Sequence, residues 1–72
     1  MKTNNEKTIY YFDKDPGFDK LKSITQGWFT ILKTIDGLSI YLNENGEYKL
    51  PINKEATDMF GIIMYGNIAI VG

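Results

Sequence analysis

The sequence contains no cysteine, no histidine and no arginine. Without cysteine the chain forms no disulfide, and without cysteine or histidine a zinc site would have only carboxylates as ligands. The same absences remove the usual catalytic triads and dyads, in which a His or Cys activates or supplies the nucleophile. We therefore expect a protein that is not an enzyme and that binds no metal and no cofactor.

The chain is also short, since 72 residues make one domain with a small core. Domains of this size rely on disulfides, metals, tight packing or self-association. Hydrophobic residues make up 43% of the chain, which excludes a disordered polypeptide. We expect a polar, flexible N-terminus at residues 1–6 and a single folded domain at residues 7–72, with self-association into a homo-oligomer left open.

Strong net charge and long apolar runs are missing as well. The net charge is -1, which argues against a nucleic-acid partner because such binding depends on neutralising phosphates. The longest apolar run, residues 59–71, is shorter than the roughly 20 residues of a membrane span. Residues 1–7 lack the apolar stretch of a signal peptide. We therefore expect a cytoplasmic protein without a membrane partner.

Segments rich in β-branched and aromatic residues predict the strands. Asp36-Gly37 predicts a two-residue hairpin turn in which both residues have positive φ. A short strand is predicted at residues 47–50, after a turn that ends at Gly46. The longer predicted strands cover residues 7–12, 28–35, 38–43 and 62–71. Because the last of these is apolar at nearly every position, we expect it to be central or buried by a partner.

Helical spacing predicts one main helix, in which Asp15 is the N-cap, Pro16 is the first helical residue and Gly27 ends the helix. Its predicted apolar face consists of Phe18, Leu21 and Ile24. A shorter helix is predicted to begin after Asn53 and to stop at Gly61. The element order β-α-β-β-β-short α-β predicts an α+β fold, with a small antiparallel or mixed sheet and one main helix packed on one face.

Alternation along residues 38–43 separates Leu38, Ile40 and Leu42 from Tyr41. This pattern predicts a sheet that is covered on one side only, with Tyr41 as an exposed binding aromatic. Tyr and Trp are frequent anchors of interfaces, and polar side chains could give specificity in a pocket between subunits. The candidate binding residues are therefore Trp28, Tyr41, Asn43, Glu44, Tyr48 and Asn53.

Four short motifs follow one another in the last two-thirds of the chain. They are Gly27-Trp28-Phe29, Asn43-Glu44-Asn45-Gly46, Leu50-Pro51-Ile52-Asn53-Lys54-Glu55-Ala56, and the apolar segment 62–72. In this order the motifs resemble a family of small phage- and plasmid-encoded domains of unknown function. The resemblance implies an origin in a phage or another mobile element, and it implies no reaction mechanism.

Several functions remain open at this point. The first is a phage or mobile-element protein that binds and inhibits or modulates a host protein, such as a defence component, in the host cytoplasm. The second is a homo-oligomer that sequesters a small-molecule or nucleotide signal. The third is a nucleic-acid-binding accessory protein, which the net charge favours least. The fourth is a structural or assembly factor.

Overall fold

The computed structural model describes residues 7–72, so the N-terminus predicted to be flexible, residues 1–6, lies outside the described residues. The four strands form one mixed sheet in the order β1-β4-β3-β2. β1 and β4 are parallel, while the other neighbouring strands are antiparallel. In chain order the elements are β1 (Ile9–Phe12), α1 (Phe18–Thr25), β2 (Phe29–Lys33), β3 (Ser39–Asn43), α2 (Gly46–Lys49), α3 (Lys54–Phe60) and β4 (Ile68–Val71). The predicted α+β fold is confirmed.

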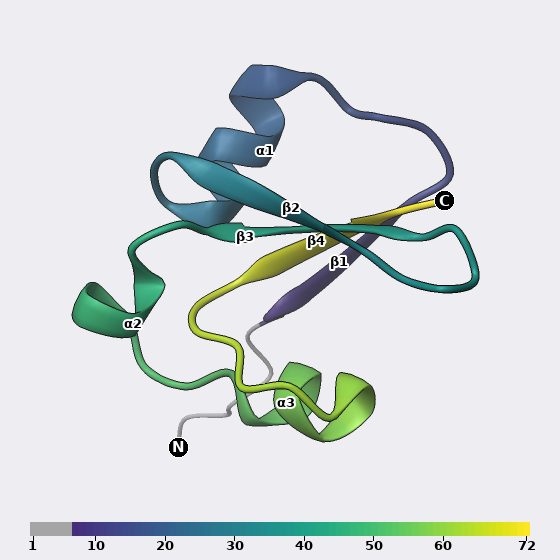
Figure 1. Cartoon of the computed structure of the whole chain (residues 1–72). Helices are drawn as coiled ribbons and strands as arrows, with labels where there is room; N and C mark the ends of the chain where they lie inside the picture. Colours follow the sequence, from purple (N-terminus) through teal and green to yellow (C-terminus); the bar gives the residue numbers. More distant parts are fainter. Residues whose placement is uncertain (1–6) are drawn as a thin grey trace, which may run out of the picture.

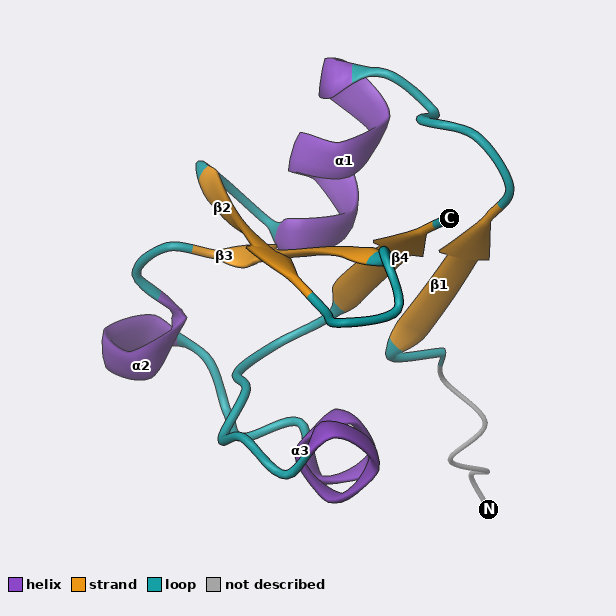
Figure 2. Ribbon diagram, turned by 45° about the vertical axis from the view of Figure 1, so that its right-hand side comes forward, coloured by secondary structure: helices purple, strands orange, loops and turns teal. Residues whose placement is uncertain are grey.

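Helices lie on both faces of the sheet, with α1 on one side and α3 on the other (Figures 1 and 2). Leu21 and Ile24 of α1 pack against Tyr41 and Ala69. On the opposite face a second cluster brings the helix α3 and the segment after it onto β1, β3 and β4; its buried members are Ile9, Ile40, Ala56, Met64, Ile68 and Ile70. The prediction of a sheet covered on one side only is therefore wrong.

β4 is one of the two inner strands, as the apolar C-terminal segment predicts, since it lies between β1 and β3. It is shorter than the predicted residues 62–71. Gly66 adopts a φ of 75°, which interrupts an extended backbone. Before it, Tyr65 forms only an isolated bridge with Ile52. The rest of the predicted strand is a connection from α3 into the sheet.

The ends of α1 differ from the prediction. The N-cap is Gly17, and no side chain caps the helix. The Asp15 carboxylate instead accepts a hydrogen bond of 2.8 Å from the Gly17 N–H, so Asp15 stabilises the turn that precedes the helix. At the other end, Gln26 takes the left-handed conformation with a φ of 68°, one residue before the predicted stop at Gly27.

The predicted hairpin joins β2 to β3, but its turn is different. The N–H of Gly37 donates to the carbonyl of Thr34, and Gly37 alone has a positive φ, of 90°. This is the pattern of a three-residue loop, in which a type I turn is followed by a glycine. Asp36 therefore has ordinary backbone angles, and the predicted two-residue turn is wrong.

The predicted strand at residues 47–50 is instead the short helix α2. The N–H groups of Tyr48 and Leu50 donate to the carbonyls of Asn45 and Gly46. The segment leaves the end of β3 with no strand beside it (Figure 1), and its backbone groups are satisfied locally. The helix α3, in contrast, begins after Asn53 and ends at Gly61 as predicted. None of the helices within residues 7–72 combines the length and the apolar character needed to cross a membrane.

Candidate functional site: an apolar cleft between β2 and α3

Tyr41, the predicted exposed aromatic, is buried, with 9% of its surface accessible. It does lie on the face opposite Ile40, as the alternation predicts, but α1 covers that face. Its ring packs edge-on against Phe29, with ring centroids 5.4 Å apart. Tyr41 is therefore a core residue, and its prediction as an exposed binding aromatic is wrong.

Asn43 is also buried, and both ends of its side-chain amide are bonded within the fold. Its Nδ2 donates to the carbonyls of Thr25 and Gln26, at 2.9 Å and 3.3 Å. Its Oδ1 accepts from the N–H of Asn45 at 2.7 Å. These bonds fix the C-terminal end of α1 to the end of β3, which leaves the side chain no free group for a ligand.

Asn53 has the same kind of role at α3. Its Oδ1 caps the helix by accepting from the N–H of Ala56 at 3.0 Å. Its Nδ2 donates to the carbonyls of Gly66 and Thr8, at 2.8 Å and 3.2 Å. One buried side chain therefore joins α3 to the segments that enter β4 and β1.

The remaining three candidates are exposed. Trp28 and Glu44 lie together at one end of the β2–β3 hairpin, where the Glu44 N–H donates to the Trp28 carbonyl at 3.0 Å. Tyr48 is on α2. The Trp28 ring packs against Phe18, with centroids 5.8 Å apart, and Lys22 Nζ lies 4.3 Å from its centroid. The structure thus brings Trp28 and Glu44 together and places Asn53 elsewhere, at α3, so the six candidates do not form one site.

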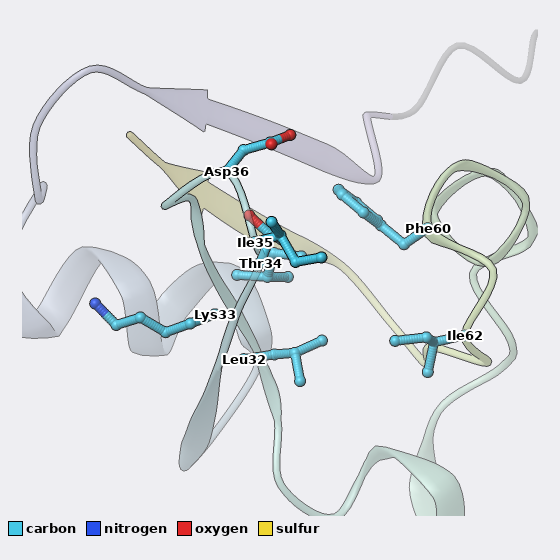
Figure 3. Close-up of a pocket in the computed structure, with 8 residues that line it drawn as sticks. Leu32, Lys33, Thr34, Ile35, Asp36, Phe60 and Ile62 are labelled. Carbon is cyan, nitrogen blue, oxygen red and sulfur yellow. The ribbon is translucent and has the colours of Figure 1, made fainter.

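A cleft that the sequence does not predict opens between the β2–β3 hairpin and the end of α3 (Figure 3). Its volume is about 420 Å³, and its lining is mainly apolar: Leu32, Lys33, Thr34, Ile35, Asp36, Ile40, Phe60 and Ile62. Leu32 and Ile62 point toward each other across the cleft, and the Phe60 ring points toward Ile35 (Figure 3). We call this feature the apolar cleft.

Large apolar side chains at the rim of the apolar cleft are exposed to solvent. Ile35 stands in the hairpin loop and is fully exposed, and Ile62 is half exposed. Ile63, which follows Ile62 in the sequence, is exposed as well. Large apolar groups that gather around a concavity mark interaction sites more often than single exposed residues do.

The polar groups of the cleft are few. Lys33 contributes to the lining, but its side chain points away from the cleft (Figure 3). The hydroxyl of Thr34 already accepts from the Leu38 N–H at 3.0 Å. Asp36 is exposed at the rim. The cleft is therefore suited to an apolar group, with a single carboxylate beside it.

Comparison of the chain with protein-family models, with curated proteins and with solved structures gives no match. The resemblance to small phage- and plasmid-encoded domains therefore stays a prediction.

Proposed function

We propose that this protein is a non-enzymatic protein of a phage or another mobile element that binds a host protein and inhibits or modulates it. A host defence component is the proposed class of target, and the host cytoplasm is the proposed place of action. The observation that carries the proposal is the apolar cleft with the exposed Ile35 and Ile62 at its rim. An apolar side chain of the partner would enter the cleft and lose its contact with water.

Recognition fits the lining of the cleft better than catalysis does. General acid–base catalysis needs a titratable side chain within hydrogen-bond reach of the reactant. Lys33 points away from the cleft (Figure 3), and Asp36 lies at the exposed rim. Partly exposed lining residues such as Leu32 and Phe60 offer contact area and no reactive group. The origin in a mobile element is supported by the motif order of the chain alone.

The experiment compares cleft variants with matched controls. Immobilised protein captures its partner from a bacterial lysate, and the partner is then purified and titrated in a calorimeter. We expect the double variant Ile35→Lys/Ile62→Lys to weaken binding by about 100-fold or more, because a partner would have to desolvate two ammonium groups. Ile52→Lys, also a change of an exposed isoleucine but outside the cleft, should bind like the wild type.

Two results would contradict the proposal. One is a lysate that yields no partner in stoichiometric amount. The other is a partner whose affinity is unaffected by the double variant but is lost in Trp28→Lys or Tyr48→Lys. That result would place the site at Trp28, at the other end of the hairpin, or at Tyr48 on α2.

A second candidate function is the sequestration of a small molecule, which the cleft volume of about 420 Å³ favours. The range of possible ligands is smaller than the sequence predicts, because the side chains of Asn43 and Asn53 are hydrogen-bonded within the fold. With Lys33 turned away, the cleft offers no cation for phosphate (Figure 3).

We expect the neutral apolar dye Nile red to bind the folded protein saturably, ATP not to compete with it, and the variant Ile62→Lys to lose dye binding. Tight binding of ATP at one site would contradict the preference for an apolar ligand.

A further inference from the structure

The edge strand β2 has one side without a neighbour. It is the last strand of the sheet, and among residues 7–72 it pairs with β3 alone. An unpaired strand edge presents N–H and C=O groups that can template another strand. Proteins protect such edges with proline, bulges or several charges, and the sequence of β2, Phe29–Lys33, contains no proline and a single charge.

The backbone groups that face this free edge can be identified from the hairpin. The Trp28 carbonyl and the Thr34 N–H are both bonded to the β3 side of the hairpin. In an antiparallel pair, the N–H and C=O of one residue point the same way, and the direction alternates along the strand. The groups of Thr30 and Leu32 therefore also point toward β3, and the residues whose groups point to the free edge are Phe29, Ile31 and Lys33.

We propose that β2 pairs antiparallel with β2 of a second copy of this chain, around a twofold axis at Ile31. In this register Ile31 lies opposite Ile31 of the second copy, and Phe29 lies opposite Lys33 of the second copy. All outward-pointing groups then find partners, in about six hydrogen bonds. The two sheets become one continuous sheet across the dimer, through an isologous contact.

The side chains of β2 support this pairing. Ile31 is 49% exposed and lies in register with Tyr41, on the face that carries α1. The buried residues of α1 pack over Tyr41 of β3 and Ala69 of β4, so the helix lies toward the centre of the sheet and leaves Ile31 uncovered. Two β-branched side chains opposite one another are a favourable cross-strand pair.

A second copy fits this edge better than an unrelated strand, because the outward residues are symmetric about Ile31. Lys33 is the only charge on β2. In the proposed register it lies opposite Phe29 of the second copy, whose ring packs inward against Tyr41 and Phe18, so no like charges meet across the axis. Self-association also stabilises a small chain that has no disulfide.

The pairing is independent of the proposed function. The twofold axis of an antiparallel pair is perpendicular to the sheet, so the apolar clefts of both copies lie on the same face of the joined sheet, and each cleft is formed within one chain. Loss of the dimer would leave the cleft in each copy, and loss of cleft binding would leave the dimer.

The experiment measures mass by light scattering between about 10 µM and about 1 mM, a range that covers weak dimers. We expect the wild type to approach twice the 8.2 kDa of one chain. Ile31→Lys should raise the dimer dissociation constant by about 100-fold or more, because two ammonium groups meet at the axis. Ile52→Lys should dimerise like the wild type.

Amide hydrogen exchange of the wild type gives a second readout that needs no variant. The amides of Phe29, Ile31 and Lys33 should exchange slowly at high concentration and fast on dilution, while those of Thr30 and Leu32 stay slow at both. A wild-type protein that is monomeric at the highest concentration overturns the proposal. So does a dimer whose outward amides exchange fast, or one that persists unchanged in folded Ile31→Lys.

Discussion

Replacing Asn53 with alanine is expected to lower the free energy of unfolding by about 2–4 kcal/mol. The change removes the cap bond to Ala56 and both bonds from Nδ2, to Gly66 and Thr8. The buried Ala56 N–H and the part-buried Gly66 carbonyl then lose these bonds, while the Thr8 carbonyl keeps its bond from the Ile68 N–H. A domain of this size has a total stability of about 4–10 kcal/mol, so urea denaturation followed by circular dichroism should show a large shift of the midpoint.

Asn45→Ala is the matched control for this prediction. Asn45 is the N-cap of α2, yet its side chain makes no capping hydrogen bond and the residue is exposed. Its substitution should change the free energy of unfolding by no more than about 0.5 kcal/mol. If both variants unfold at the midpoint of the wild type, Asn53 does not hold α3 to the segments that enter β1 and β4.

Replacing Ile40 with alanine should cost about 2–5 kcal/mol of stability. Ile40 has no accessible surface and lies at the centre of the cluster on the α3 face, on a strand that has neighbours on both sides. The change removes apolar contacts and leaves a space that a sheet anchored on both sides fills poorly. The measurement is again the unfolding free energy from denaturant titration.

Ile35→Ala makes the same chemical change at a fully exposed isoleucine of the hairpin loop. We expect a change in unfolding free energy of about 0.5 kcal/mol or less. Ile40→Val should fall between the two, at about 0.5–1.5 kcal/mol. Equal losses for Ile35→Ala and Ile40→Ala would contradict the assignment of Ile40 to the core and of Ile35 to the surface.

Local chemistry explains which elements could be predicted from the sequence. The helix from Asn53 to Gly61 was predictable because its cap and its stop are both short-range signals. The central place of β4 followed from its apolar composition. The α2 segment was not predictable as a helix, because its turn residues are equally compatible with a hairpin, and only the lack of a neighbouring strand decides between the two.

The candidate site depends on long-range packing, so local sequence signals could not predict it. The sequence predicted on which face of the sheet Tyr41 lies, but the burial of Tyr41 depends on where α1 lies. Leu32 and Phe60 are distant in the sequence, and only the placement of α3 on the sheet brings them to one cleft. One local signal was Ile35, a large apolar residue directly before the Asp36-Gly37 turn, but the predicted strand 28–35 included it, whereas β2 ends at Lys33.

Binding of a partner protein in the apolar cleft can be located residue by residue by NMR on the ¹⁵N-labelled protein with unlabelled purified partner. The amide signals of Leu32, Ile35, Phe60 and Ile62 should shift most on addition of the partner, with little change at Trp28, Glu44 and Tyr48. Shifts confined to Trp28, Glu44 and Tyr48, with the four cleft signals unmoved at saturation, would show that the partner does not bind in the cleft.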